Sequence, residues 1–157
     1  MMQLIIGFAL VALTVGMHSI ATSIIAFLLR SYAIDFHDRF DTKARPLILG
    51  LTAVSLAVKH YLDILLWATV YWGVPGHDDF NSFEVAVYFS SVTYTSLGFG
   101  DVVLTNQWRL LCGIEAMNGI LLFGWSTAML FVLVQRFWNS PPDSELSDSG
   151  NANVDIE

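Results

Sequence analysis

The chain has 157 residues, of which 55% are hydrophobic and only 13% are charged. An ordinary soluble domain carries about 25% charged residues, so this composition excludes a typical water-soluble protein and favours the membrane class. The formal net charge of −7 excludes the basic footprint of a nucleic-acid-binding protein, and no nucleic-acid partner is expected.

Three apolar stretches are long enough to cross a bilayer core of about 30 Å, which takes about 20 helical residues. The first lies in residues 1–30, has no basic residue before it and is longer than a signal-peptide core, so we expect a retained transmembrane helix. The second covers residues 47–72 and follows Pro46, which suits the first turn of a helix. The third covers residues 108–138.

A shorter segment, residues 83–94, lies between the second and third of these stretches and is followed by Ser, Thr and Gly at 95–101. It is too short and too polar to span the membrane, so we expect a re-entrant helix followed by a loop. Irregular backbone at membrane depth is tolerated only where it is buried in protein or lines water. The predicted fold class is an all-α membrane protein with three transmembrane helices, a re-entrant helix and a loop.

The basic residues predict the orientation of the chain in the membrane. Four of the seven lie around the connector 31–46, namely Arg30, Arg39, Lys43 and Arg45. Arg136 ends the third helix. The positive-inside rule therefore places the connector and the C-terminus in the cytoplasm of a multi-pass cell-membrane protein, with the N-terminus outside. The acidic tail, residues 139–157, cannot bury apolar area and is expected to be disordered.

The sequence Thr95-Ser96-Leu97-Gly98-Phe99-Gly100-Asp101, preceded by the short helix 83–94, resembles the pore loop of the potassium-channel superfamily. The resemblance covers residues 47–135 and is closest to small prokaryotic channels with one pore loop per chain. It implies a homotetramer in lipid, in which four such segments line one axis and their backbone carbonyls replace the water shell of K⁺. It implies no cofactor, and no metal other than the permeant K⁺ at the filter.

Each residue of this segment then has an expected role. Successive carbonyls can face one axis only if alternate residues adopt backbone angles that a Cβ disfavours, and Gly98 and Gly100 meet this need. The resemblance implies that Leu97 and Phe99 point away from the axis and pack against the pore helix. It also implies that Asp101 lies at the outer mouth and accepts a hydrogen bond from that helix.

Two positions depart from the usual pattern of the superfamily. Ser96 stands where threonine is usual, and Leu97 stands where valine or isoleucine is usual. The loss of β-branching removes side-chain stiffness, so a weakly selective monovalent cation channel is an alternative to a potassium-selective one. A non-conducting membrane subunit that modulates a partner is a further alternative. An enzyme is not expected, because no nucleophile–base or metal-ligand constellation is evident in the sequence.

The third helix carries residues whose roles follow from the same resemblance. Gly119 or Gly124 would be the bend that opens an inner gate, although close helix packing through small residues explains them equally well. Ile120, Phe123 and Thr127 would line the cavity below the filter. The pore helix would direct its C-terminal end, with its negative partial charge, toward the channel centre, where it favours a cation.

Ionisable groups within the apolar stretches are costly and are usually paired or functional. Lys59 and Asp63 are four residues apart and share one helix face. The helical repeat turns Glu115 toward the pore helix or the second helix, and turns Asn118 almost opposite the cavity. We expect Lys59, Asp63 and Glu115, with His18 and Asn118 nearby, to form a polar cluster behind the filter that makes gating sensitive to pH.

Overall fold

The computed structural model describes residues 1–35, 45–73, 80–104 and 108–138. The tail 139–157, for which disorder is predicted, lies outside these ranges, and so does most of the connector 31–46.

Four helices make up the described part of the chain, and no strand occurs in it. In chain order they are α1 (Met2–Asp35), α2 (Arg45–Gly73), α3 (Phe83–Tyr94) and α4 (Arg109–Trp138). Three of them contain stretches long and apolar enough to cross a membrane, namely Met2–Ser31, Arg45–Gly73 and Arg109–Phe137. The predicted fold class, an all-α membrane protein with three spans and one shorter helix, is confirmed.

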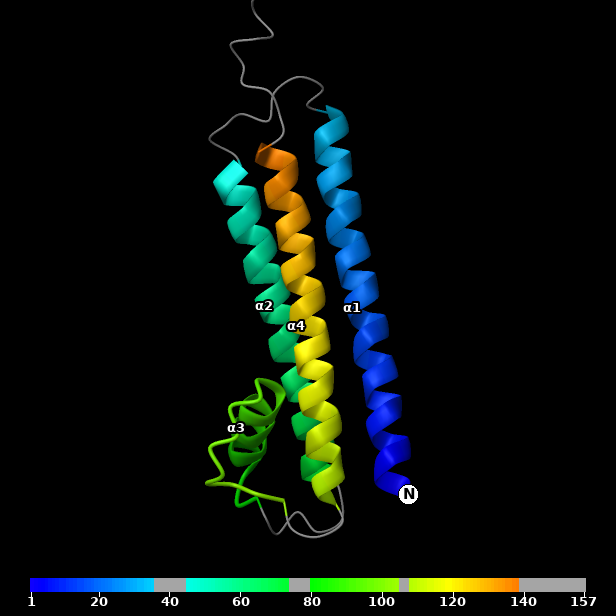
Figure 1. Ribbon diagram of the computed structural model, residues 1–157, viewed down its shortest axis with the longest axis vertical. Helices are drawn as coiled ribbons and strands as arrows, with labels where there is room; N and C mark the ends of the chain where they lie inside the picture. The colour runs from blue at the N-terminus through cyan, green and yellow to red at the C-terminus, as the bar shows by residue number, and fades with distance from the viewer. Residues whose placement is uncertain (36–44, 74–79, 105–107, 139–157) are drawn as a thin grey trace, which may run out of the picture.

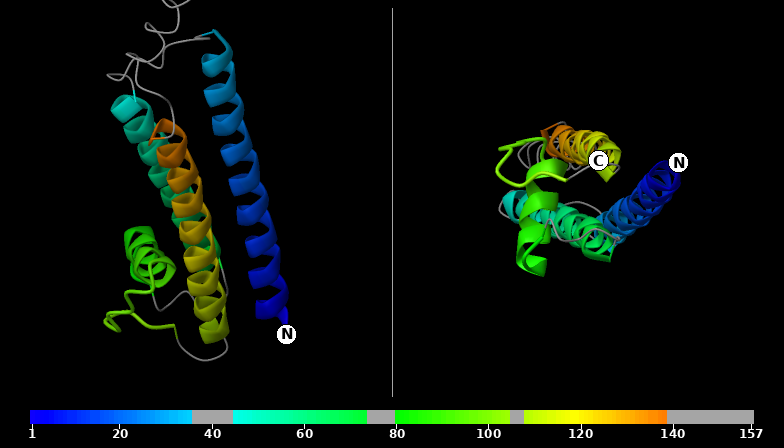
Figure 2. Two further views of the ribbon diagram at one scale, coloured as in Figure 1. Left: turned by 45° about the horizontal axis from the view of Figure 1, so that its top comes forward. Right: turned by 90° about the horizontal axis from the view of Figure 1, so that it is seen from below.

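The three long helices run side by side, with α1 and α4 pointing the same way and α2 antiparallel to both (Figure 1). The short helix α3 lies at one end of this bundle, the end at which the chain begins (Figure 1). Both views in Figure 2 show α3 and α1 on opposite sides of the α2–α4 pair. Any structural coupling between α1 and α3 therefore involves side chains of α2 or α4.

The start of α3 is fixed by local capping. Ser82 is the N-cap residue in an extended conformation, and its side chain accepts a hydrogen bond from the backbone N–H of Val85. Glu84 adds a negative charge to the first turn, where the helix dipole favours it. With 12 residues, α3 is about 18 Å long, which is too short to cross a bilayer core. The length of α3 therefore agrees with the predicted short helix that does not span the membrane.

The core lies where α3 packs against α2. Aromatic side chains fill it: Trp67 and Tyr71 from α2 meet Phe80 before α3 and Phe89 within α3, all four buried. The ring of Tyr71 contacts that of Phe89 edge to face, with centroids 5.1 Å apart. This packing holds α3, and with it the segment that follows, at a fixed place beside the bundle.

Candidate functional site

The segment after α3 has an alternating backbone. Ser96, Gly98 and Gly100 have φ angles of 59°, 56° and 80°, all in the left-handed region. These are the only positive-φ residues in the described part of the chain, and they alternate along the segment. Gly98 and Gly100 have the backbone angles predicted for them, whereas the same conformation at Ser96 was not anticipated. A left-handed conformation is unfavourable for a residue with a Cβ, so the serine is strained.

Two hydrogen bonds explain why the serine adopts this conformation. The backbone N–H of Ser96 donates to the carbonyl of Thr93, and the N–H of Leu97 donates to the carbonyl of Val92, both at 2.9 Å. With Thr95 as the C-cap, this pair of bonds is a Schellman motif, in which the position of Ser96 usually holds glycine. The first residues of the predicted filter are thereby attached to the end of α3.

The side chains of Leu97 and Phe99 do not pack against the pore helix of their own chain. They are 61% and 66% exposed, although both are large and apolar. These two side chains, two residues apart, form an apolar surface that is left uncovered in the described part of the chain.

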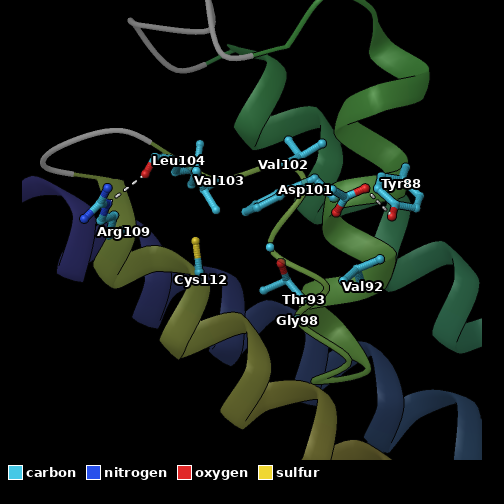
Figure 3. A pocket seen from close by; sticks show the side chains of 12 residues that line it. Tyr88, Val92, Thr93, Gly98, Asp101, Val102, Val103, Leu104, Arg109 and Cys112 are labelled. Carbon is cyan, nitrogen blue, oxygen red and sulfur yellow. Dashed lines mark hydrogen bonds between the residues drawn. The ribbon is translucent and has the colours of Figure 1, made fainter.

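Asp101 ends the segment and is bonded to α3, as predicted. The hydroxyl of Tyr88 donates to the Asp101 carboxylate at 2.7 Å (Figure 3). This hydrogen bond holds the pKa of Asp101 below its usual range and raises the pKa of Tyr88. The bond therefore ties the outer end of the segment to the helix and keeps the carboxylate ionised there.

A cavity of about 480 Å³ lies between this segment, α3 and the start of α4 (Figure 3). Thr93 and Val92 line it from α3, and Gly98 lines it from the segment. Cys112 lines it from α4, as a free and partly buried thiol. The segment is attached to α3 by the backbone N–H groups of Leu97 and Gly98, which both donate to the carbonyl of Val92, and at its other end by the bond from Tyr88 to Asp101.

Glu115 of α4 is fully buried and holds α3 from the other side. Its carboxylate accepts hydrogen bonds from Ser90 of α3 at 2.5 Å and from Tyr71 of α2 at 2.6 Å. The Ser90 hydroxyl also lies 2.9 Å from the carbonyl of Ile64 on α2, so these two acceptors share its single proton. The predicted orientation of Glu115, toward the pore helix and the second helix, is confirmed. This carboxylate joins three helices at one point.

Lys59 and Asp63 form the predicted ion pair within α2. The ammonium lies 2.6 Å from the carboxylate, and both side chains are buried. The hydroxyl of Tyr94, the last residue of α3, also donates to Asp63, at 3.3 Å. Tyr94 lies one residue before the predicted filter begins, so the ion pair is coupled to the filter through a single side chain.

A chain of hydrogen bonds continues from Tyr94 to the first helix. His60 bonds Tyr94 through Nδ1 at 3.0 Å and Ser126 through Nε2 at 2.9 Å, and Ser126 bonds His18 of α1 at 3.4 Å. Tyr94 donates to Asp63, which fixes one end of this series of hydrogen bonds. In one consistent assignment, each group donates to the next in the order His18, Ser126, His60, Tyr94 and Asp63. Side chains of all four helices take part in this chain.

A single polar cluster behind the filter was predicted, but the structure contains two separate hydrogen-bonded groups. Glu115 belongs to one group with Ser90 and Tyr71, whereas Lys59 and Asp63 belong to another with Tyr94. No hydrogen bond or ion pair joins Glu115 to Lys59 or Asp63 in the described part of the chain. The separation arises because Ser90 and Tyr71 supply the two donors that the Glu115 carboxylate needs, so it does not require the ammonium group.

Asn118 belongs to neither group. It is buried against α1, where its amide donates to the hydroxyl of Thr14 at 2.9 Å. Its predicted direction, almost opposite the cavity face of α4, agrees with this contact with α1. Gly7 lies on the same side, close to Ile114 of α4. These two contacts join α1 to α4 in addition to the hydrogen bond between His18 and Ser126.

Several members of these groups were missed from the sequence. Tyr71, Ser90, Tyr94 and Ser126 carry single hydroxyls, which are common in membrane helices and give no periodic signal. His60 does carry a signal in the sequence, since an imidazole within an apolar stretch is unusual, but the predicted cluster did not include it.

The glycines of α4 differ in their surroundings. A Cβ added to Gly119 would lie 2.0 Å from the carbonyl oxygen of Tyr94, so α3 and α4 meet here backbone to backbone. Nothing lies within 4 Å of a Cβ added to Gly124. Close packing therefore accounts for Gly119, while Gly124 is unconstrained within one chain.

Ile120 and Thr127 were predicted to line the ion-path cavity below the filter, which is not the 480 Å³ cavity described above. Both lie on an exposed face of α4, with Ile120 62% exposed. Phe123 is only 37% exposed, because its ring packs on those of His60 and Tyr94, at centroid distances of 4.5 and 5.5 Å. Phe123 thus lies between the predicted cavity face and the hydrogen-bonded chain behind it.

Comparison with known proteins gives one match. A family model described as an ion channel matches residues 48–136, which is more than half of the chain. The match begins within α2 and ends within α4, so it contains the short helix and the alternating segment but leaves α1 out. No curated protein and no solved structure matches the sequence.

Proposed function

Because the chain belongs to the ion channel family that its residues 48–136 match, we propose that it is one subunit of a homotetrameric, potassium-selective channel. Potassium ions would pass through a filter formed by residues 95–100 from each of four chains. Backbone carbonyls would replace the water shell of the ion, and Ser96 would add its hydroxyl as the innermost ligand ring.

The alternating backbone of Ser96, Gly98 and Gly100 is the observation that carries this proposal. A strand whose alternate residues are left-handed turns successive carbonyls to one side, which is what a column of ion sites needs. In a water-soluble protein a glycine-rich turn would be the ordinary explanation. Here the segment follows a short helix that lies between two spans and has one face buried, and its outer end is fixed by the bond from Tyr88 to Asp101.

Exposed apolar side chains support the assembly of several chains. Leu97, Phe99 and Ile120 are each more than 60% exposed in one chain, and all lie on or below the predicted filter. Further copies arranged around an axis would cover them and complete each ring of ligands. Fourfold symmetry is what the resemblance to potassium channels implies.

The orientation follows from the basic residues and from the position of α3. The N-terminus and α3 lie at one end of the bundle (Figure 1). Arg30 and Arg136 lie near the C-terminal ends of α1 and α4, and Arg45 is the first residue of α2, so all three belong to the other end of the bundle. By the positive-inside rule the filter would face the outside of the cell membrane and the C-terminus the cytoplasm.

A weakly selective monovalent cation channel is the second candidate, and Ser96 is the residue that favours it. Its left-handed backbone lacks the glycine that relieves strain, and its side chain lacks the β-branch that would stiffen a ligand ring. A filter whose backbone and ligand ring are flexible at Ser96 would discriminate less sharply between K⁺ and Na⁺. A non-conducting modulatory subunit is the third candidate.

An ion-flux assay separates the three candidates. Purified protein is reconstituted into two sets of liposomes. The first set is loaded with KCl and diluted into NaCl, and the second set is loaded with NaCl and diluted into KCl. A potassium-selective channel releases K⁺ at a rate that far exceeds Na⁺ release. Comparable rates favour the weakly selective channel, and no flux above that of empty liposomes favours the non-conducting subunit. The particle symmetry of the same preparation tests the tetramer.

A further inference from the structure

A groove separate from the filter lies between α1 and α4. Its volume is about 380 Å³, and it is lined mainly by apolar side chains. Those of α4 include Trp125, Ala128, Val132 and Leu133, and those of α1 include Ala26 and Leu29. The family match does not include α1, so this groove is a feature that the first helix adds to the channel domain.

Two arginines lie at one end of the groove. Arg30 lines it from α1 and Arg136 lines it from α4. Each is the residue before the last in its membrane-spanning stretch, since these stretches end at Ser31 and Phe137. Both guanidinium groups therefore lie where a span meets the headgroup layer, and both belong to the end that the positive-inside rule places in the cytoplasm.

The length of the groove fits one leaflet of a membrane. From Trp125 to Arg136 the helix advances eleven residues, or about 16 Å, and half of a bilayer core is about 15 Å thick. An acyl chain lying along the groove would therefore reach its deep end while its headgroup stayed beside the arginines.

The groove is on the side of α4 away from the expected ion path. Arg136 lies nine residues after Thr127, which at about 100° per residue places it on the opposite face of the helix. Trp125 and Val132 lie on that face as well. An occupant of the groove would therefore touch α4 from behind without entering the cavity.

We propose that this groove binds one anionic phospholipid of the cytoplasmic leaflet, with an acyl chain along α4 and the headgroup phosphate between Arg30 and Arg136. Arginine suits this role because its planar fork binds phosphate oxygens in a bidentate way. Basic pockets between membrane helices at the cytoplasmic side are a recognised means of binding anionic headgroups. The charge of the two guanidinium groups selects the headgroup, and the apolar wall accepts the tail. The site rests on the proposed orientation but not on ion selectivity.

Native mass spectrometry of the detergent-purified full chain tests the proposal directly. The probes are palmitoyl-oleoyl phosphatidylglycerol and the phosphatidylcholine with the same two chains. We expect the wild type to retain phosphatidylglycerol in preference to phosphatidylcholine. Arg30→Gln and Arg136→Gln should each weaken that retention about fivefold, since each removes one cation from the headgroup site. Arg109→Gln is the control, because it removes one charge from the other end of α4, at a residue that does not line this groove, and it should change retention less than twofold.

A second variant keeps both arginines and fills the apolar wall. Ala128→Phe should abolish retention of phosphatidylglycerol by occupying the space of the acyl chain. In parallel, phosphatidylglycerol with brominated chains should quench a part of the tryptophan fluorescence that is missing in Trp125→Phe. These two measurements keep the proposal testable if an arginine variant fails to assemble.

Equal retention of the two lipids by the wild type would overturn the proposal, and so would unchanged retention in the arginine variants. If another copy of the chain covers the groove, delipidated protein takes up no phosphatidylglycerol at any ratio, which also overturns it. Because none of these measurements depends on a current, a channel that proves unselective leaves the lipid site standing, and a selective channel without lipid preference refutes it.

Discussion

The backbone carbonyl of Tyr94 lies against Gly119, so close that a Cβ on the glycine would come within 2.0 Å of the oxygen. This contact joins the end of the pore helix to the middle of α4. Since the carbonyl belongs to the residue that precedes the filter by one position, any displacement of α4 here would move the base of the filter.

Gly119→Ala is therefore expected to destabilise the channel, because the new methyl group meets backbone rather than a flexible side chain. Overpacking of this kind costs about 1–3 kcal/mol in free energy of unfolding. We expect lower thermal stability of the purified protein and loss of current. Gly124→Ala is the matched control, since nothing lies within 4 Å of its added Cβ, and it should gain about 0.5–1 kcal/mol of helix stability. Unchanged stability in Gly119→Ala would show that the two backbones are not in contact.

Gly98→Ala tests the alternating backbone. The glycine has a φ of 56°, and nothing lies within 4 Å of an added Cβ, so the substitution introduces backbone strain of about 1–2 kcal/mol without a steric clash. We expect the oligomer to assemble and K⁺ flux to disappear. Gly50→Ala, on an open helix surface, is the control and should conduct like the wild type. Normal flux in Gly98→Ala would mean that the filter lies elsewhere.

Glu115 and Ser90 form a hydrogen bond that a double-mutant cycle can measure. Ser90→Ala removes one hydrogen-bond partner of the buried Glu115 carboxyl group, and Glu115→Gln replaces that carboxyl group with an amide. A hydrogen bond contributes about 0.5–1.5 kcal/mol between neutral groups and about 1.5–3 kcal/mol when one group is charged. The coupling energy from thermal unfolding of the two single variants and the double variant should therefore be at least about 0.5 kcal/mol. A coupling energy near zero would contradict a role for Glu115 in holding α3.

The buried ion pair of Lys59 and Asp63 predicts that removing one charge destabilises the protein more than removing both. Lys59→Met leaves the Asp63 carboxylate without its cation, which for a buried pair costs about 3–5 kcal/mol. Lys59→Met combined with Asp63→Leu removes both charges and should recover most of that loss. The two variants are compared by thermal unfolding in detergent. A double variant less stable than the single one would show that Asp63 is held mainly by Tyr94.

Protonation of Asp101 should change conduction at low pH. Because its pKa is lowered in the folded chain, mainly by the bond from Tyr88, the stabilisation from this bond is present above the ordinary aspartate range and is lost as pH falls through the lowered value. Tyr88→Phe removes the bond, so the pKa of Asp101 should be higher in this variant than in the wild type. When the filter side is acidified, the variant should therefore lose conductance at a higher pH than the wild type. Single-channel conductance against pH gives both curves, and coincident curves would contradict this coupling.

Local patterns in the sequence were enough to predict the elements of the pore. Residues 83–94 form a helix as predicted, because the segment is apolar, starts after a serine cap and ends before a glycine-containing run. Gly98 and Gly100 were assigned correctly, since glycine is the residue that a left-handed backbone demands. The long helices followed from hydropathy alone.

What the sequence did not predict depends on how the helices are rotated and paired. The helical repeat placed Lys59 and Asp63 on one face and turned Glu115 toward the same region, but it does not say which donors reach each carboxyl group, and two groups formed in place of one. Ser96 adopts a left-handed backbone because of hydrogen bonds to α3, and a serine carries no signal for this. The link from His18 to Tyr94 crosses three helix interfaces, which no local pattern encodes.

The most direct test of a potassium-selective pore is the reversal potential of single channels in a planar bilayer with KCl on one side and an equal concentration of NaCl on the other. A filter formed by residues 95–100 predicts currents that reverse far from zero, at a potential set by the potassium gradient, with no such currents from Gly98→Ala. Currents that reverse near zero under the same conditions would contradict potassium selectivity.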